Sequence, residues 1–312
     1  MPDPDAMTWI PGGTFRMGSD LAGYPEEGPP HLVTVAGFWM DTTPVTVAQF
    51  AAFAAATGYR TVAERPLDPG AYPDLAAEAL VPGSLVFRPA AGPVDLTDPL
   101  TWWRYVPGAD WAHPDGPGST VDGRGDHPVV HVCWEDVAAY AAWAGKDVAT
   151  EAEWEFAARG GLDGARYAWG DEFAPSGRLM ANTWIGEFPW QNLKPREIHR
   201  TTPVGSFPAN GFGLFDVTGN VWEWTRDFYR ARHSPAGHAC CAVTDPRFDD
   251  AAGSYGTDEA GGAHVPRRVV KGGSHLCAPN YCERYRPAAR QAQQVESSMS
   301  HLGFRCVIRP SH

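Results

Sequence analysis

Glycine and proline set the strongest constraint on how this chain can fold. The sequence holds 34 glycines and 29 prolines among 312 residues. Because glycine weakens regular elements and proline removes a backbone donor, this content favours a fold rich in loops. It stays below the level typical of disordered chains. Thirteen tryptophans and an apolar fraction of 43% can fill a sizeable core. We therefore predict one loop-rich α+β domain with little regular secondary structure, spanning residues 1–312.

Few segments carry clear secondary-structure signals. Two capping boxes, Thr46 with Gln49 and Thr150 with Glu153, mark the starts of short helices. Glycines follow each expected helix and provide its stop. The region 231–266, rich in small and polar residues, is predicted to be a surface excursion. The expected helices run from Thr46 to a stop at Gly58, over 135–144, and from Thr150 to about Arg159; the expected strands cover 32–35, 129–132, 269–270 and 304–308.

The charge balance excludes several classes of partner. The chain has 37 acidic and 25 basic residues and a net charge of −12, and it has no basic stripe. Nucleic acid and anionic membranes are therefore not expected as partners. No apolar window is long enough to span a bilayer, and the first residues lack the pattern of a signal peptide. We expect a cytoplasmic protein.

Two of the six cysteines form the most informative pair. Cys277 and Cys282 are five residues apart, so their thiols can converge only if the backbone turns between them. Pro279-Asn280 supplies turn chemistry at that point. Converging thiolates suit a disulfide, a redox switch or a soft metal such as Cu(I), whereas zinc requires further ligands. A structural disulfide or two buried thiols remain the plain alternatives. The vicinal Cys240 and Cys241 are interpreted as surface thiols.

The residues around this pair favour chemistry. Arg284, Arg286 and Arg290 follow Cys282 within eight residues, and nearby cations favour a thiolate. Ser274 places a hydroxyl just before the pair. A serine after two glycines can also simply bond the local backbone.

This segment resembles the active-site strand of the formylglycine-generating enzymes, also called sulfatase-modifying factors. Similar blocks cover nearly the whole chain, and most of them identify a superfamily with several chemistries. The block that points to the enzyme is the paired cysteines preceded by Ser274. The resemblance implies the C-type-lectin-like fold of that family. It rests on Gly272-Gly273-Ser274, Cys277, the run 281–286, the run 288–290, and the blocks 10–18, 127–132, 150–155, 182–184, 219–224 and 303–306.

The resemblance also implies an activity. Members of the family are copper-dependent oxidases that convert a cysteine in a Cys-x-Pro-x-Arg segment of an unfolded sulfatase to Cα-formylglycine, using O2 and a thiol reductant. Carried over to this chain, Cys277 and Cys282 would hold Cu(I), and Ser274 and Trp222 would line the oxygen pocket. For Trp222, core packing is the plain alternative. The rival functions are a non-catalytic binding or scaffold paralogue and a metal-free thiol–disulfide oxidoreductase that uses the same cysteine pair.

Structural calcium is a second implication of the resemblance. One predicted site uses the side chains of Asp216 and Glu223 with the carbonyls of Gly219 and Val221, and such oxygens suit Ca²⁺.

A second calcium site would begin at the side chain of Asn182 and the carbonyl of Thr183. In the family this site ends on an Asp-Gly-Phe segment, which here is replaced by Arg196-Glu197-Ile198. The predicted ligands at Glu197 and Ile198 are therefore shifted or lost. An arginine in place of a ligand could itself mimic the cation.

A substrate peptide that carries arginine needs an acidic or aromatic cleft. The candidate is an aromatic cluster with two nearby aspartates, and the negative net charge would attract a basic peptide. Core or loop anchoring is the alternative for each residue. The candidate residues are Trp102, Trp103, Tyr105, Asp110, Trp111 and Asp115.

Overall fold

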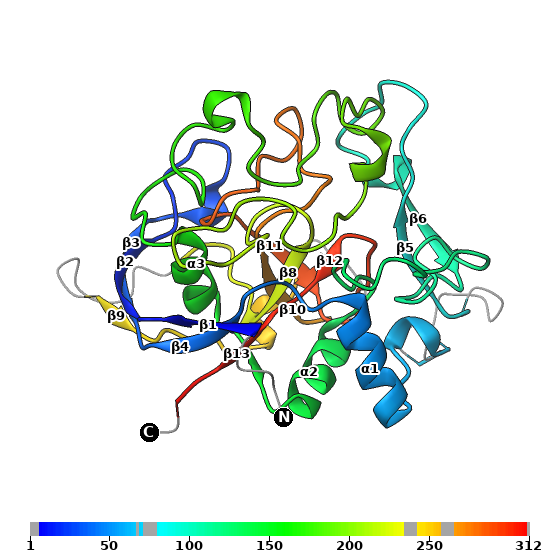
Figure 1. The fold of residues 1–312 in the computed structure, drawn as a ribbon, viewed down its shortest axis with the longest axis horizontal. Helices are drawn as coiled ribbons and strands as arrows, with labels where there is room; N and C mark the ends of the chain where they lie inside the picture. The colour runs from blue at the N-terminus through cyan, green and yellow to red at the C-terminus, as the bar shows by residue number, and fades with distance from the viewer. Residues whose placement is uncertain (1–5, 67–68, 71–79, 234–241, 257–264, 311–312) are drawn as a thin grey trace.

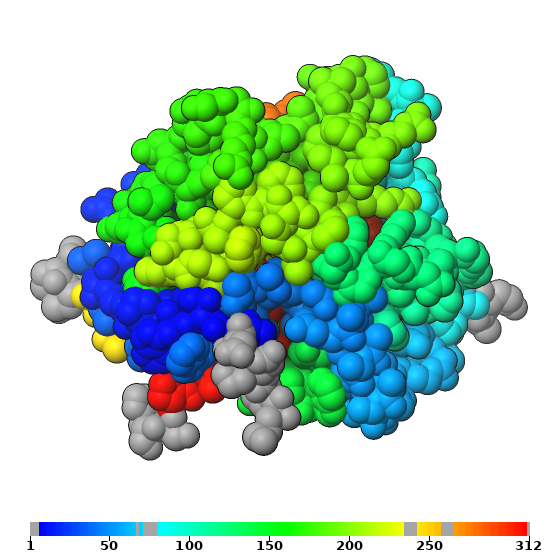
Figure 2. All heavy atoms as spheres, viewed as in Figure 1, coloured from blue at the N-terminus to red at the C-terminus, as the bar shows by residue number. Residues whose placement is uncertain are grey.

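The fold was analysed in a computed structural model that describes residues 6–66, 69–70, 80–233, 242–256 and 265–310. Short helices and small sheets are joined by long loops, as Figure 1 shows. The loops between about residues 160 and 220, coloured green to yellow-green, cover much of the face seen in Figure 2. The expectation of a loop-rich α+β fold is confirmed.

The three predicted helices are present. They are α1 (Val47–Thr57), α2 (Trp134–Trp143) and α3 (Glu151–Arg159). Both predicted capping boxes form, and the glycines after α1 and α3 adopt the left-handed conformation that ends a helix. The helices have 9 to 11 residues. In the described ranges, none is long and apolar enough to cross a membrane.

Four small sheets complete the framework within the described ranges. Two have four strands, in the orders β1-β4-β13-β7 and β11-β10-β8-β12; a third has the order β2-β3-β9, and β5 pairs with β6. Most of these strands have no counterpart in the sequence predictions. Their bounds are β1 (Met7–Ile10), β2 (Gly13–Met17), β3 (His31–Val35), β4 (Phe38–Asp41), β5 (Gly83–Phe87), β6 (Trp103–Pro107), β7 (Asp147–Val148), β8 (Trp222–Phe228), β9 (Val243–Thr244), β10 (Arg267–Lys271), β11 (Arg290–Gln294), β12 (Leu302–Gly303) and β13 (Cys306–Ile308).

Two strand predictions need correction. Residues 129–132 do not form a strand, because His131 adopts a left-handed backbone conformation that breaks any extended pairing. The strand expected over 304–308 is confirmed only for 306–308, which form β13. Residues 304–305 lie between β12 and β13, and Arg305 turns inward to the buried carboxylate of Glu223. The predictions at 32–35 and 269–270 are confirmed within β3 and β10.

The predicted excursion at 231–266 is only partly described. Within it, β9 pairs in parallel with β3, and the side chain of Ser254 is fully buried. The described part therefore packs against the body of the molecule. Cys240 and Cys241 lie outside the described residues.

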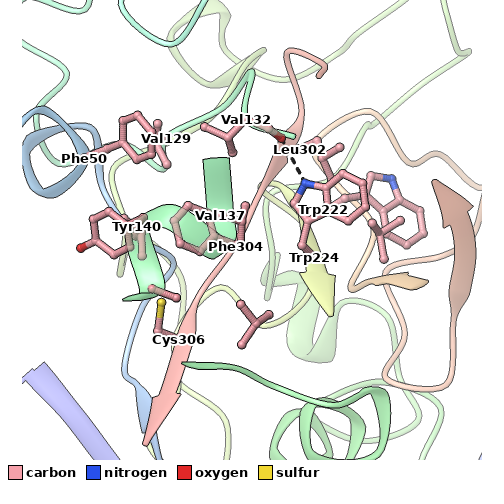
Figure 3. Close-up of a cluster of buried hydrophobic side chains, with 14 of the residues drawn as sticks. Phe50, Val129, Val132, Val137, Tyr140, Trp222, Trp224, Leu302, Phe304 and Cys306 are labelled. Carbon is pink, nitrogen blue, oxygen red and sulfur yellow. Dashed lines mark hydrogen bonds between the residues drawn. The ribbon is translucent and has the colours of Figure 1, made fainter. Parts of the chain in front are cut away.

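The principal core cluster lies where α1 and α2 meet the sheet that contains β8. Phe50 of α1 stacks on Tyr140 of α2 at a ring distance of 5.9 Å, and Tyr140 meets Phe304 edge-on at 5.3 Å. Figure 3 shows these rings on one side of the cluster and Trp222 and Trp224 on the other. Cys277 and Cys282 belong to the same cluster. The candidate site is thus built on the core.

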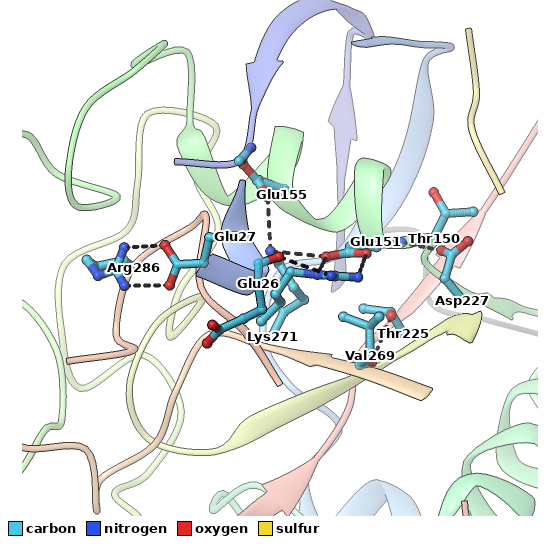
Figure 4. Close-up of polar contacts among 12 residues, drawn as sticks. Glu26, Glu27, Thr150, Glu151, Glu155, Thr225, Asp227, Val269, Lys271 and Arg286 are labelled. Atoms are coloured by element: carbon cyan, nitrogen blue, oxygen red, sulfur yellow. Dashed lines mark hydrogen bonds and ion pairs between the residues drawn. The ribbon is translucent and has the colours of Figure 1, made fainter. Parts of the chain in front are cut away.

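Helix α3 is buried along its whole length, including its charged residues. Lys271, at the end of β10, places its Nζ 2.9 Å from Glu155 and 3.7 Å from Glu151 (Figure 4). Arg159 pairs with Glu155 at 2.7 Å, and Arg290 pairs with Glu151 at 2.6 Å. Since a buried charge is tolerated only when it is paired and hydrogen-bonded, these contacts fix α3 against β10 and β11.

Removing one charge from this network should be costly. We expect Glu155→Gln to lower the free energy of unfolding by about 3–5 kcal/mol, because Lys271 is left buried without its nearest carboxylate. The control is Glu135→Gln, which breaks an ion pair whose glutamate side chain is 60% exposed, and which should cost at most about 1 kcal/mol. Chemical denaturation measures both changes. Equal losses in the two variants would contradict this account of α3.

The same network predicts sensitivity to acid. Burial alone would raise the pKa of Glu151 and of Glu155, but the neighbouring Arg290, Lys271 and Arg159 hold both near 2, below the usual 4.5. A lowered folded-state pKa stabilises the protein above the unfolded value, and this stabilisation is lost as the pH falls. The free energy of unfolding should therefore decline between pH 4.5 and 2. Denaturation curves measured across that window test this; a flat profile would count against it.

Candidate active site

The site segment begins with two glycines that the fold requires. Gly272 and Gly273 follow β10 with φ angles of 91° and 68°, which side chains rarely adopt. A Cβ at Gly272 would lie 2.7 Å from the carbonyl oxygen of Val217, and one at Gly273 would lie 2.7 Å from that of Arg284. Only glycine permits this close approach of three backbone segments around the cysteine pair.

A turn then brings the two thiols together. The amide of Cys282 donates to the carbonyl of Ala278 at 2.8 Å, and the amide of Cys277 donates to that of Ser274 at 3.0 Å. The two sulfur atoms lie 3.1 Å apart. Because a disulfide bond is about 2.05 Å long, these are two free thiols in van der Waals and hydrogen-bonding contact. The turn expected between the cysteines is therefore present.

The pair is buried and asymmetric. Cys277 is 2% exposed and Cys282 is 6% exposed. Nη1 of Arg284 lies 3.9 Å from the sulfur of Cys282. The Cys277 thiol as hydrogen-bond donor, together with Arg284, lowers the pKa of Cys282, whereas burial and the neighbouring sulfur raise the pKa of Cys277. Cys282 is thus the thiol prepared to ionise first.

Contacts from the N-terminal part of the chain hold Arg284 in place. Glu26 accepts from its Nη2 at 2.8 Å, and the ring of Tyr24 lies 5.1 Å from the guanidinium carbon. The Tyr24 hydroxyl also accepts from the amide of Glu283 at 3.0 Å. The sequence analysis missed Tyr24 and Glu26. They lie about 260 positions before Arg284, and no local sequence pattern connects residues so far apart.

The other two arginines of the segment have structural partners. Arg286 forms a bidentate pair with Glu27 at 2.5 and 2.7 Å. Arg290 pairs with Glu151 of α3. No contact with a cysteine sulfur is recorded for either one among the described residues. Of the three arginines expected to favour a thiolate, Arg284 is therefore the one placed to act on Cys282.

Ser274 contacts the pair directly, and Trp222 belongs to the same core cluster. Ser274 is fully buried, and its hydroxyl accepts from the amide of Leu276 at 3.2 Å, which is the local backbone bond considered as the alternative. Its amide donates to the sulfur of Cys277 at 3.4 Å. Trp222 is buried in the cluster that includes both cysteines. The catalytic roles of both residues stay predictions.

Two loops hold the cysteine segment from outside. The amide of Trp184 donates to the carbonyl of Cys277 at 2.9 Å. The carbonyl of Asn220 accepts from the amide of His275 at 3.0 Å and contacts its Nδ1 at 2.8 Å. Displacement of either loop would therefore move the backbone of the pair.

The first predicted calcium site is partly consistent with the geometry. Oδ2 of Asp216 accepts from the amide of Gly205 at 2.7 Å, while its buried Oδ1 has no hydrogen-bond partner among the described residues. Burial raises the pKa of this carboxyl to about 6. Such an orphaned oxygen suits a bound cation. Glu223, in contrast, is fully engaged by Arg305 and by Nε1 of Trp154 at 2.7 Å.

At the second predicted calcium site, a lysine occupies the position expected for a carboxylate ligand. Asn182 and Thr183 are buried, but Glu197 is exposed in a short 3₁₀ turn over 196–198, with Ile198 half-buried. Oδ1 of Asn182 accepts instead from the side-chain amine of Lys194, which the sequence analysis did not single out.

The expected aromatic cluster does not form as one unit. Trp111 packs on Phe50 in the main core, while Trp102 is buried in another cluster and meets the ring of Tyr281 at 5.4 Å. Asp115 pairs with Arg88 and Arg200. These residues mainly anchor loops, although Tyr281, half-exposed between the cysteines, connects Trp102 to the site.

A cavity of about 550 Å³ lies elsewhere and is lined by neither cysteine. Its lining includes Arg16, Arg159, Asp163 and Arg286. We place the site at the thiol pair because the chemistry of a site follows from its reactive groups, and cavity size alone supplies none.

Comparison with known families agrees with this geometry. The family model of the sulfatase-modifying factor enzyme 1-like domain matches residues 1–310. The chain belongs to this family. Its resemblance to the formylglycine-generating enzymes, inferred from the sequence, is thereby confirmed.

Curated relatives include proteins with different names. The formylglycine-generating enzyme of Mycobacterium tuberculosis is 52% identical over 96% of this chain and 97% of its own length. A mouse relative named inactive C-alpha-formylglycine-generating enzyme 2 is 37% identical over 97% of this chain and 85% of its own. Family membership therefore does not by itself establish activity.

Among solved structures, PvdO from Pseudomonas aeruginosa matches with a TM-score of 0.59 and 24% identity. The match covers 96% of this chain and 93% of PvdO. At this identity the likeness bears on the fold alone, and it supports the α+β fold predicted for this family member.

The asymmetry of the pair predicts how Cys282 reacts in metal-free protein. In Arg284→Met the pKa of Cys282 should rise, so its alkylation near neutral pH should slow by a few-fold, because a smaller fraction of the thiol is ionised. Arg284→Lys, which keeps the charge, is the control and should lose less. Rates measured against pH by mass spectrometry of the alkylated peptide test this. Identical rates for wild type and the Met variant would refute the role given to Arg284.

Proposed function

We propose that this chain is a formylglycine-generating enzyme, which oxidises a cysteine of an unfolded sulfatase polypeptide to Cα-formylglycine. The observation that carries the proposal is the pair of free, buried thiols of Cys277 and Cys282, 3.1 Å apart. This pair lies in a chain that is 52% identical to an enzyme of that name. The proposed substrate segment is Cys-x-Pro-x-Arg.

Copper is the proposed cofactor, with the two cysteines as its ligands. Two thiols at this separation are a soft donor set of the kind that selects Cu(I). When bound, copper would supply the activation of O2 that thiol chemistry alone lacks. The protein contributes a dry environment, the electrostatic support of Arg284 for the Cys282 thiolate, and the backbone bonds that fix both cysteines.

The proposed reaction balances with one O2 and two molecules of a thiol reductant. The substrate –CH2SH group becomes –CHO, and its sulfur leaves as hydrogen sulfide. The two reductant thiols form a disulfide, and the second oxygen atom leaves as water. An external thiol is therefore a required partner, and Cys277 and Cys282 are not consumed.

Ser274 and Trp222 are proposed to shape the place where O2 and the substrate thiol meet. Both are buried, Trp222 shares a core cluster with the pair, and the Ser274 amide donates to the sulfur of Cys277. A structural calcium ion is proposed at Asp216, where Oδ1 lacks a partner among the described residues. Glu223 does not support this ion, since Arg305 and Trp154 occupy its oxygens. The remaining proposed ligands are the carbonyls of Gly219 and Val221.

A second candidate function is a metal-free thiol–disulfide oxidoreductase. It is favoured by the 3.1 Å separation, because closing a disulfide of about 2.05 Å would need only a small movement. This activity would proceed without O2 or copper. A third candidate is a binding protein without catalysis, because one mouse relative is named inactive.

A peptide assay decides between these functions. A synthetic Cys-x-Pro-x-Arg peptide is incubated with Cu(I)-loaded protein, O2 and a thiol, and then analysed by mass spectrometry. We expect the mass to fall by the difference between –CH2SH and –CHO. Cys277→Ser and Cys282→Ser should abolish conversion, because each removes one soft ligand. Cys133→Ser is the matched control, since Cys133 is a buried free cysteine at the start of α2, where serine also caps well.

The other outcomes separate the alternatives. Disulfide exchange without copper, with no aldehyde, would establish the oxidoreductase. An unchanged peptide with folded, copper-binding protein would indicate a relative that acts on another thiol. An unchanged peptide without copper binding would leave the non-catalytic binding protein.

A further inference from the structure

Lys194 is a buried amine that has no carboxylate partner in the part of the chain that the structure describes. It is 7% exposed, and its Nζ lies 2.5 Å from Oδ1 of Asn182. Burial lowers the pKa of this amine to about 7. In either protonation state the amine keeps an N–H to donate to Asn182. An isolated buried lysine is costly unless its position serves the structure.

The amide of Asn182 is oriented by its other contacts. Its Nδ2 donates to the carbonyl of Arg200 at 2.8 Å and lies 3.4 Å from both Oγ1 of Thr202 and Oδ1 of Asn220. Since three oxygens surround Nδ2, the assignment of Oδ1 to the side facing Lys194 is well determined. This oxygen is the one that the sequence analysis assigned to a calcium ion.

The backbone of Lys194 is held at both its amide and its carbonyl. Its amide donates to Oδ1 of Asn192 at 3.2 Å, and its carbonyl contacts Nε2 of His199 at 2.7 Å. Glu197, the carboxylate expected as a calcium ligand, is exposed in the following turn. The backbone therefore directs the amine inward and leaves the carboxylate outside.

These residues do not fit a calcium ion. Ca²⁺ takes six to eight oxygen ligands, several of them from carboxylates. Here the oxygen of Asn182 is already taken by an amine, and no carboxylate of the described residues is recorded in contact with it. An ion at this position would have to displace Lys194 from a buried contact.

We propose that the amine of Lys194 takes the place of the second predicted calcium ion beside Asn182. The loops that meet at Asn182 are then held together by a side chain and need no metal. The consequence reaches the active site. The carbonyl of Asn182 accepts from the amide of Asn220, and Trp184, two residues further on, holds the carbonyl of Cys277. The loop behind Cys277 is thus fastened by a covalently attached donor that chelators cannot remove.

Calcium counting on the purified full chain tests the proposal without an activity assay. Native mass spectrometry at saturating calcium should give the same number of bound ions for wild type and Asn182→Ala. Loss of one ion in Asn182→Ala would overturn the proposal. If that variant does not fold, wild-type protein treated with an amine-reactive reagent supplies the second readout. Lys194 should be equally protected in calcium and in EDTA, and its exposure in EDTA would overturn the proposal.

A stability comparison completes the test. Lys194→Met keeps the length of the side chain but removes the donor, so its thermal midpoint should fall by the same amount in calcium and in EDTA. Arg196→Met, in the same loop at an exposed position, is the matched control and should leave the midpoint nearly unchanged. An unchanged midpoint for Lys194→Met, or its rescue by calcium, would contradict the replacement.

Discussion

The buried ammonium of Lys271 joins the interior of the molecule to its reactive segment. It lies between Glu151 and Glu155 of α3, in a helix that is buried along its whole length. Lys271 is also the last residue of β10, directly before the glycines that open the cysteine segment. Because a charge in this environment must be paired, these contacts favour the observed arrangement of the helix, the strand and the start of the site.

A second set of constraints explains how so many loops remain ordered. A buried tryptophan contributes a large apolar ring, and its single N–H donor usually finds a hydrogen-bond acceptor. Trp154 donates to Glu223, Trp224 donates to the carbonyl of Val132, and Trp184 donates to that of Gln191. The first two contacts tie α3 to β8 and β8 to the segment before α2, far apart in the sequence, whereas Trp184 closes its own loop. The loops are thus held by side chains rather than by long backbone ladders.

The sequence predicted the features whose geometry is local. Capping boxes at Thr46 and Thr150 locate α1 and α3, and the spacing around Pro279 correctly implied a turn. The failures involve distant partners. The apolar run 129–132 resembles a strand, but its backbone amides bond to separate distant loops. The amide of Val129 donates to the carbonyl of Val45, and that of His131 donates to the carbonyl of Met299.

For the candidate site, too, the sequence predicted the local features and missed the contacts with distant residues. The cysteine pair could be found from its spacing and its resemblance to a family. The guanidinium that acts on Cys282 could not be separated from its neighbours, because that choice depends on Tyr24 and Glu26 folding over Arg284. Similarly, the exposed Glu197 and the buried Lys194 are three residues apart, and only the turn between them decides which one faces Asn182.

The central claim is that two thiols from one turn form a soft metal site in the core. X-ray absorption at the copper edge of Cu(I)-loaded protein tests it most directly. The account predicts a copper environment dominated by two sulfur neighbours, with one of them lost in Cys282→Ser. An environment dominated by nitrogen or oxygen, or a spectrum that the substitution leaves unchanged, would contradict it.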